Sequence, residues 1–480
     1  MKKRTLAFLM ALALLIVLPA SAVAESAGKT APEGMPGEPP EGMGELPEGM
    51  GEPPQGMGQP PEGGPGGGFG GGTPPGGTAS SFEYTAATEI TEAAEADGQS
   101  YESSISDESA LIVDTDADVT LANVTVAKTG DSNGGDNCNF YGLNAALLAM
   151  GGTTTTITGA TITSDASGAN GVFSYGGNGG QNGAQGDGTT VIISDSTITT
   201  TGDGSGGIMT TGGGVTYASN LNVETSGRSS AAIRTDRGGG TVVVDGGTYT
   251  SNGLGSPAIY STADITVSNV TLASNLSEGV CIEGKNAITL TNCDLTANNT
   301  RMNGNATFLD TIMIYQSMSG DADSGESNFT MTGGSVTSLS GHMFHVTNTN
   351  AVITLMDVAL VNEGSDILLS VCDDGWSGAS NVATLNAVNQ ALTGTILVGD
   401  NATLTLNLTD GSSFEGTISG EIENAKGEAI SSEIGTVTVT LDETSTWTLT
   451  GDTHITAFNG DLSRVETNGY ALYVDGEAVK

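Results

Sequence analysis

Ile265-Thr266-Val267-Ser268-Asn269-Val270-Thr271-Leu272 is the stretch of sequence that decides the fold. Apolar residues alternate with polar ones, a turn residue follows, and a second short alternating segment comes after it, as expected of two strands that meet at a corner. Variants of this stretch recur along most of the chain. Their turn residues are all Gly, Asn, Asp or Ser, which tolerate a left-handed or tightly turned backbone. They are Asn123, Gly159, Asp195, Ser219, Gly246, Asn269, Asn292, Gly333 and Asp357.

The spacing of the turn residues indicates a repeat array. By subtraction, successive gaps are 36, 36, 24, 27, 23, 23, 41 and 24 residues, which is a period in the twenties with three insertions. The apolar residue two places before each turn forms one inward column: Leu121, Ile157, Ile193, Tyr217, Val244, Val267, Leu290, Met331 and Leu355. A second inward column runs in step with it: Val172, Ile208, Ile233, Ile259, Val280, Ile312, Phe344 and Leu369. We therefore expect an all-β parallel coil of about 9–12 rungs, with terminal caps, at a spacing of about 4.8 Å.

The composition fits this reading and excludes some partners. The chain of 480 residues holds 73 Gly and only 5 % aromatic residues, which suits short strands joined by tight turns. Its formal charge is −42, with 13 basic and 55 acidic residues. Such a field repels nucleic acid and anionic membrane surfaces.

The amino-terminal part divides into three segments. Residues 1–24 have a basic start, an apolar core and a small-residue cleavage site at Ala22-Val23-Ala24, which predicts a secretory signal peptide. Without its three basic residues the count becomes 10 against 55, or −45. Residues 25–81 repeat Pro-Glu-Gly-Met and become Gly-rich, so we expect a disordered linker. A methionine-rich copper site is the alternative for this segment.

The rest of the chain divides by the quality of the repeat. Residues 82–118 are expected to form an amino-terminal cap, residues 119–425 the repeats with insertions, and residues 426–480 the last rungs and a carboxy-terminal cap. No second apolar run of about eighteen residues follows residue 24, so we expect no membrane span. Four cysteines, Cys138, Cys281, Cys293 and Cys372, do not make a disulfide scaffold in a chain of this length, and we expect most of them to be buried or reduced packing residues. Three disulfide pairings are possible, and the sequence does not choose among them.

This pattern resembles right-handed parallel β-helix proteins of the pectin-lyase-like group over residues 100–480. The signal segment, the Pro/Gly/Met linker, the stretch from Ser229 to Gly240 and the ending with Asn468-Gly469-Tyr470 also resemble large secreted adhesin-like proteins of anaerobic bacteria. The resemblance implies a right-handed coil and an extracellular or cell-surface location. It implies no established activity.

The outward residues of the second strand are the expected binding surface. Sugar rings stack on aromatic faces while Asn, Asp and Arg bond their hydroxyl groups. The candidate ligand-binding residues are Phe173, Tyr175, Arg234, Asp236, Tyr260 and Tyr315. Two alternatives remain open: the aromatic residues can pack beneath inserted loops, and Arg234 can pair with Asp236 to fasten the turn at residues 238–240.

An enzyme is the second reading. Polysaccharide lyases and polygalacturonases of the resembled group use clustered acids with basic residues, and the candidates here are Arg234, Asp236, Arg237, Asp373 and Asp374. The two parts of this set lie more than a hundred residues apart in the sequence, and neither family pattern is complete.

Calcium is the one candidate cofactor. Asp321, Asp323 and Glu326 place hard oxygen ligands in a Gly-bearing loop inside the longest insertion. A solvated acidic loop is the alternative.

The sequence thus predicts a secreted or surface-displayed adhesin that binds a polysaccharide or a cell-surface glycan without catalysis. A polysaccharide lyase or glycoside hydrolase acting on an acidic glycan is the first alternative. A structural spacer or coat protein is the second.

Overall fold

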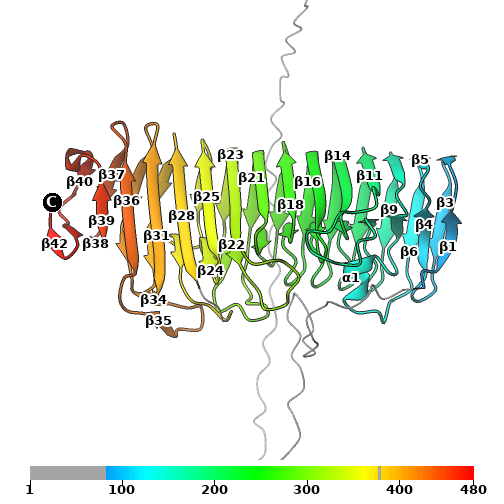
Figure 1. The fold of residues 1–480 in the computed structure, drawn as a ribbon, viewed down its shortest axis with the longest axis horizontal. Helices are drawn as coiled ribbons and strands as arrows, with labels where there is room; N and C mark the ends of the chain where they lie inside the picture. Colours follow the sequence, from blue (N-terminus) through cyan, green and yellow to red (C-terminus); the bar gives the residue numbers. More distant parts are fainter. Residues whose placement is uncertain (1–82, 377–379) are drawn as a thin grey trace, which may run out of the picture. The chain divides into compact units, whose positions relative to one another are not determined.

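The computed structural model describes residues 83–376 and 380–480, and the expected signal peptide and linker lie outside these ranges. The described chain is nearly all-β, and its strands follow one another in chain order along one axis (Figure 1). This arrangement is compatible with a β-solenoid. A short α-helix, α1 (Asn137–Tyr141), and a 3₁₀ helix, η1 (Leu462–Arg464), are its helical elements among the described residues.

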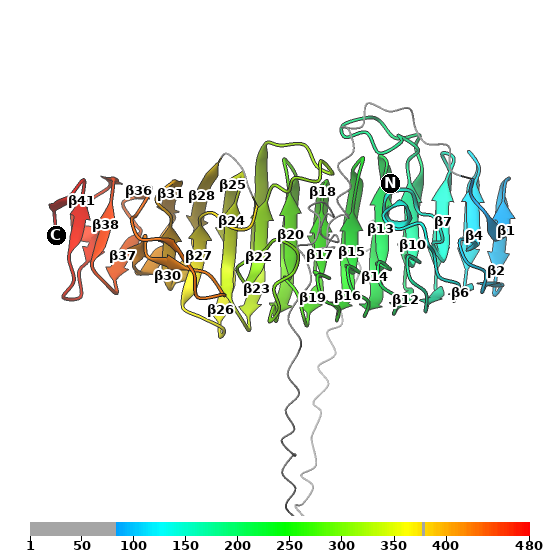
Figure 2. The same cartoon turned by 90° about the horizontal axis from the view of Figure 1, so that it is seen from below.

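Sheet A holds thirteen parallel strands, which stack in sequence (Figure 2). They are β1 (Ala86–Ile90), β4 (Ser109–Asp114), β7 (Leu147–Met150), β10 (Val172–Tyr175), β13 (Ile208–Thr211), β15 (Ile233–Thr235), β17 (Ile259–Ser261), β20 (Val280–Glu283), β22 (Asp310–Tyr315), β24 (His342–Thr347), β27 (Ile367–Val371), β30 (Thr395–Val398) and β33 (Ile418–Ser419).

Sheet B holds twenty strands, in two columns on either side of a corner. They are β2 (Ala94–Asp97), β3 (Ser100–Ser103), β5 (Asp118–Ala122), β6 (Thr125–Lys128), β8 (Thr154–Thr158), β9 (Thr161–Ser164), β11 (Thr190–Ser194), β12 (Thr197–Thr200), β14 (Gly214–Thr225), β16 (Gly240–Ser251), β18 (Asp264–Ser268), β19 (Thr271–Ser274), β21 (Ala287–Ala297), β23 (Glu326–Ser338), β25 (Asn350–Met356), β26 (Ala359–Asn362), β28 (Asn381–Val388), β31 (Ala402–Thr409), β36 (Thr436–Leu441) and β39 (Ala457–Asn459).

Three small sheets complete the carboxy-terminal part. The first holds β29 (Ala391–Thr393), β32 (Ser413–Gly416), β37 (Thr446–Leu449) and β40 (Val465–Glu466). The second is the antiparallel pair β34 (Ile422–Glu423) and β35 (Ala429–Ser431), and the third holds β38 (Thr453–Ile455), β41 (Leu472–Val474) and β42 (Glu477–Ala478).

The second predicted inward column is confirmed. Each of its residues pairs with the next one in register across sheet A, from Val172 and Ile208 to Phe344 and Leu369. All are buried in one continuous core. Sheet A has one strand more than the expected upper number of rungs, because residues 86–114 form strands that join the stack at its amino-terminal end.

The first column is confirmed except at Tyr217. The structure pairs Ile193 with Ala218, so Ala218 is the inward residue, and Tyr217 is 47 % exposed. The corner shifts by one as well: Asn220 adopts a left-handed conformation with φ 53°, and Ser219 does not. The sequence pattern favoured Tyr217 because it has the larger apolar side chain. The pairing of neighbouring strands places Ala218 in the inward column instead.

The remaining eight predicted turn residues adopt positive φ angles, as at Asn269 with φ 58°. Asn side chains at these corners also bond the rung before them. Asn269 donates to Asp245 over 2.7 Å, and Asn220 donates to Asp195 over 2.6 Å. The corners therefore form polar ladders that hold successive rungs in register.

All four cysteines are buried and free, as expected of packing residues. Within residues 83–376 and 380–480, no helix has the length and apolar character needed to cross a membrane.

Candidate functional site

Inserted loops cover the outer face of sheet A at its amino-terminal end. Phe173 is fully buried and Tyr175 is 8 % exposed, both within a second apolar cluster outside the main core. The Tyr141 ring at the end of α1 meets the Tyr175 ring edge-on at 5.9 Å. At these two residues the structure shows the alternative in which aromatic residues pack beneath inserted loops, because the insertion that carries α1 folds back over them.

Tyr260 and Tyr315 are also buried, and their hydroxyl groups surround a polar centre, the carboxyl group of Glu283. Their hydroxyl groups donate to Glu283 Oε2 over 2.5 and 3.2 Å. Ser319 Oγ donates to Glu283 Oε1 over 3.1 Å, and Ser317 donates to the same oxygen. Burial raises the pKa of Glu283, against these hydrogen bonds, which act to lower it. This carboxyl group ties the loop of residues 316–325 to sheet A.

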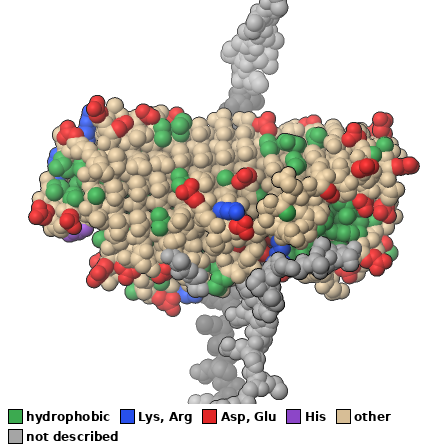
Figure 3. All heavy atoms as spheres, viewed as in Figure 1, with side chains coloured by type: hydrophobic (Ala, Val, Ile, Leu, Met, Phe, Trp, Pro, Cys, Tyr) green, Lys and Arg blue, Asp and Glu red, His purple; other side chains and the backbone are tan. Residues whose placement is uncertain are grey.

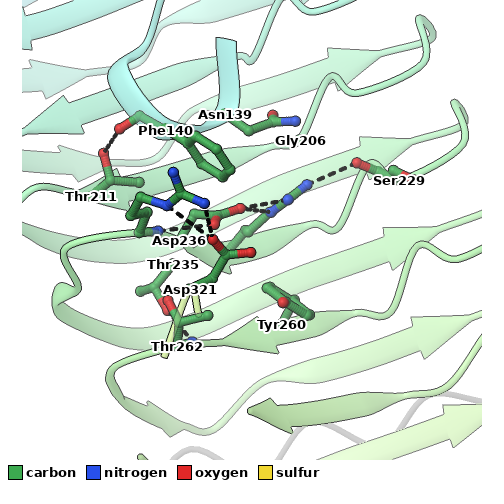
Figure 4. A network of polar contacts seen from close by, with 12 residues as sticks. Asn139, Phe140, Gly206, Thr211, Ser229, Thr235, Asp236, Tyr260, Thr262 and Asp321 are labelled. Atoms are coloured by element: carbon green, nitrogen blue, oxygen red, sulfur yellow. Dashed lines mark hydrogen bonds and ion pairs between the residues drawn. The ribbon is translucent and has the colours of Figure 1, made fainter. Parts of the chain in front are cut away.

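Two arginine–aspartate pairs belong to the network of polar contacts that includes Tyr260 (Figure 4). Arg234 Nε and Nη2 both contact Asp236 Oδ2, at 3.1 and 2.5 Å, and Arg234 Nη1 donates to the Ser229 carbonyl. The guanidinium group also lies 5.2 Å from the Tyr260 ring centre. Arg234 is 8 % exposed and Asp236 2 %, so the predicted structural pairing of these two residues is present.

Arg237 does not join the Arg234 pair but reaches across to the inserted loop. Its Nε donates to Asp321 Oδ1 over 2.9 Å, and its guanidinium carbon lies 4.1 Å from the Phe140 ring centre in α1. Arg237 therefore links two insertions that are 181 residues apart in sequence (321 minus 140).

The residues expected to bind calcium have other partners. Asp321 pairs with Arg237, Asp323 pairs with Lys285 at 2.8 Å, and Glu326 is an exposed residue at the start of β23. The part of the chain that the structure describes has no group of three or more His, Cys, Asp or Glu side chains arranged for a metal ion.

The two acids considered for catalysis, Asp373 and Asp374, lie in different surroundings. Asp373 is exposed and accepts from Asn381 and Asn401. The Asp374 side chain is fully buried, with Oδ2 3.5 Å from His345 Nε2 and Oδ1 bonded by Thr307. Neither acid lines either of the pockets described below.

His345 belongs to a sealed polar cluster. Its Nδ1 lies 2.8 Å from Ser370 Oγ, and His342 Nδ1 lies at the same distance from that hydroxyl group. His345, Ser370 and the Asp374 side chain have no exposed surface. The contacts run from Ser370 through His345 to Asp374, an arrangement that resembles a nucleophilic triad. Because all three side chains are buried, a substrate could reach Ser370 only if the covering loops opened.

The first pocket, which we call the aromatic pocket, is a small space of about 40 Å³ under the loops of sheet A. Its lining combines aromatic, aliphatic and sulfur-containing side chains with four other polar or charged ones, Ser229, Arg234, Glu278 and Asn303. The full set of lining residues is Ser229, Ala231, Arg234, Gly255, Pro257, Tyr260, Glu278, Cys281, Asn303, Ala306, Met313, Tyr315 and Trp376. Three of the six predicted ligand-binding residues, Arg234, Tyr260 and Tyr315, are therefore brought together here.

The second pocket, which we call the polar groove, is larger and more open, with a volume of about 560 Å³. It lies at the turns from sheet A to sheet B, and glycines and uncharged polar residues dominate its lining. These residues are Asn182, Gly183, Ala184, Gln185, Gly186, Gly213, Val215, Gly238, Gly239, Gly240, Thr241, Thr262, Ala263, Asp264, Lys285, Asn286 and Asp323.

One wall of the polar groove is the loop of residues 176–188, and hydrogen bonds hold it in place. Asn178 Nδ2 donates to the Ala184 carbonyl and to the Gly238 carbonyl, at 3.2 and 3.1 Å. The Gly238 amide donates to Asn182 Oδ1 over 3.2 Å. A Cβ atom at Gly238 would lie 2.6 Å from Asn178 Oδ1, so glycine permits this close approach.

The sequence pattern did not single out Glu278, Asn303 or Trp376. All three lie outside the strands, in loops that follow no period. A signal existed only for Trp376, as one of two tryptophans in the chain.

No family model matches the sequence, and neither the curated proteins nor the solved structures yield a match.

Proposed function

We propose that this chain is a secreted, non-catalytic protein that binds a neutral polysaccharide or cell-surface glycan in the polar groove. The observation that carries the proposal is the groove itself. Its lining takes residues from four successive turns of the coil, near Gly213, Gly239, Ala263 and Lys285. At the usual spacing of parallel strands this covers about 14 Å, so a repeating polymer would meet a repeating set of polar groups.

The chemistry of the groove suits hydroxyl groups. Gln185, Thr241 and Asp264 are exposed at its surface. Amide, hydroxyl and carboxylate side chains together donate to and accept from sugar hydroxyls. A net charge of −42 disfavours an acidic polymer, which is why a neutral glycan is proposed.

Binding without catalysis is favoured by the placement of the acids. Glycoside hydrolysis usually requires two carboxyl groups on either side of the bond that breaks. The polar groove is lined by two, Asp264 and Asp323, but Asp323 is paired with Lys285 at 2.8 Å. Asp236 is paired with Arg234, and the Asp374 side chain is fully buried. Secretion rests on the signal-peptide pattern of residues 1–24, and a surface adhesin is the role that combines it with glycan binding.

We also propose that the coil is right-handed. Parallel strands of one sheet are connected with this hand in nearly all known cases, because the strands themselves twist to the right.

A printed glycan array followed by titration calorimetry tests the binding function. The double variant Gln185→Ala/Asp264→Ala should lose at least about ten-fold in affinity for any neutral oligosaccharide that the parent protein binds, since two polar contacts are removed. Glu415→Gln, an exposed change in β32, should leave the affinity unchanged. The proposal fails if no neutral glycan binds above background, or if the double variant binds as well as the parent.

A further inference from the structure

The aromatic pocket has a composition that the glycan proposal does not use. Tyr260, Tyr315 and Trp376 supply aromatic rings, and the rings of Tyr315 and Trp376 lie 4.9 Å apart at 51°. The hydroxyl groups of both tyrosines are already bonded to Glu283. The tyrosines therefore offer the pocket their rings rather than their hydroxyl groups, and aromatic faces attract cations.

Glu278 brings a buried carboxyl group to the pocket, and Ser277 Oγ donates a hydrogen bond to its Oε2. Glu278 is 7 % exposed, and the four ion pairs among the described residues do not include it. Arg234, the cation in the lining, is neutralised by Asp236 and bonded to the Ser229 carbonyl. A buried carboxylate without a cation is costly, so a positively charged ligand would be stabilised here.

Asp310 is a second buried acid close to Glu278, and it too is absent from the four ion pairs of the described residues. Burial raises the pKa of Asp310 well above its usual range, with further contributions from the charges of Glu278 and Asp374. Burial also raises the pKa of Glu278. Both shifts are the response of carboxyl groups that lack a positive partner.

Two residues of the lining each carry a buried polar side-chain atom that has no hydrogen-bond partner. Trp376 Nε1 and Asn303 Oδ1 are both inaccessible to solvent and unpaired among the described residues, and each residue is 9 % exposed. The first is a donor and the second an acceptor. A ligand that satisfies both must carry an acceptor as well as a donor.

The size of the pocket limits the ligand to a few atoms. A volume of about 40 Å³ would hold about three or four water molecules, because each needs about 10–15 Å³ by this measure. A whole sugar ring therefore does not fit.

We propose that the aromatic pocket binds a small primary ammonium ion that carries a hydroxyl group, that is, an amino alcohol. The ammonium group would lie against the tyrosine and tryptophan rings, pair with Glu278 and donate to Asn303 Oδ1. The hydroxyl oxygen of the ligand would accept from Trp376 Nε1. A divalent metal fits less well, since Glu278 is the one carboxylate in a lining made largely of rings, methyl groups and sulfur.

Titration of the full chain with ethanolamine, followed by calorimetry and tryptophan fluorescence, tests this site. Trp447 is fully buried and bonded to the Gly416 carbonyl, so a change in fluorescence on binding reports on Trp376. Ethanolamine should bind at least about ten-fold more tightly than ethylene glycol, which replaces the ammonium group with a hydroxyl, because the charge-assisted contact is lost. Glycolate and calcium chloride should give no signal.

Variants separate this site from the glycan site. Glu278→Gln should weaken ethanolamine binding at least about ten-fold, and Trp376→Phe, which keeps a ring but removes the N–H, should weaken it about three-fold or more. The groove variant Gln185→Ala/Asp264→Ala should bind ethanolamine as the parent does, whatever its effect on glycans. Circular dichroism melting confirms that each variant is folded.

Equal affinity for ethanolamine and ethylene glycol would overturn the proposal, as would full affinity in folded Glu278→Gln. No binding of ethanolamine to the parent at tens of millimolar would show that the pocket holds only water. Loss of glycan binding alone would leave the ammonium site standing.

Discussion

The outer faces of the two large sheets differ sharply although their strands have the same chemistry. On sheet B the outward residues Thr266, Thr289 and Thr330 remain partly or fully exposed, and the face seen in Figure 3 is mostly uncharged and polar. On sheet A the outward residues Arg234, Tyr260 and Met313 lie beneath inserted loops and are at least nine-tenths buried. The difference teaches that loops, not strands, create the candidate site.

The covered face has the properties of a second interior. Apolar clusters form there outside the main core, and carboxyl groups such as those of Glu283 and Asp310 are buried on the same face. Polar groups in such surroundings interact more strongly than they do at an exposed surface. Changes beneath the loops should therefore cost more than changes on the bare face of sheet B.

Glu283→Ala should give the largest effect. Its removal leaves the hydroxyl groups of Tyr260, Tyr315, Ser317 and Ser319 without their shared acceptor, so the free energy of unfolding should fall by about 3 kcal/mol. Urea denaturation measures this change. Thr289→Ala, on the exposed face of sheet B, is the matched control and should cost less than about 0.5 kcal/mol. Equal effects of the two changes would remove the distinction between the faces.

Asp310→Asn should change how stability depends on pH. The folded-state pKa of Asp310 is raised, so its contribution to stability is present below the unfolded pKa of about 3.9 and is lost as pH rises through the folded pKa. The variant should therefore gain stability relative to the parent as pH increases from 4 to 7, as measured by urea midpoints.

His342 changes the pH dependence of stability in the opposite sense, since its pKa is lowered rather than raised. Its contribution must therefore be separated from that of Asp310. Burial, with the His345 charge, lowers the pKa of His342 to about 3, so its contribution is present above pH 6.5 or so and is lost as pH falls toward 3. Comparing Asp310→Asn with the parent at each pH cancels this shared term. The exposed change Glu415→Gln serves as a control, and a variant slope equal to that of the parent would contradict the buried-acid interpretation.

Asn269→Ala should give the smallest of the three effects, at the corner of sheet B. An alanine in the left-handed conformation, with φ 58° in the parent, costs about 1 kcal/mol, and the exposed bond to Asp245 is lost as well. Asn269→Gly, which is free of the backbone strain, should cost less than Asn269→Ala. Thermal unfolding of the pair tests the order, and the reverse order would mean that the Asp245 bond, not the backbone, controls the corner.

Much of the coil was accessible from the sequence because its rules are local. Alternation shows which side chains face inward, and Asn or Gly at a fixed offset marks each left-handed corner. The exception at Tyr217 shows the limit of this reasoning. A one-residue choice between Tyr217 and Ala218 depends on the register of neighbouring rungs, which local apolar patterning cannot supply.

The candidate site was only partly predictable. The sequence singled out Arg234, Tyr260 and Tyr315, and they do share a pocket. It also suggested an open strip from Phe173 onward, whereas α1 and the loops cover that face. Glu278, Asn303 and Trp376 complete the pocket from loops, and irregular loops carry no periodic signal.

The sequence by itself determined the parallel coil, its two inward columns and most of its corners, since each follows from contacts repeated from one rung to the next. Only the tertiary structure decided that the aromatic residues are covered, that Arg237 reaches Asp321 and that the chain forms both a polar groove and a smaller aromatic pocket. These features depend on where long insertions fold back. That depends on contacts between residues far apart in the chain, which no short repeat encodes.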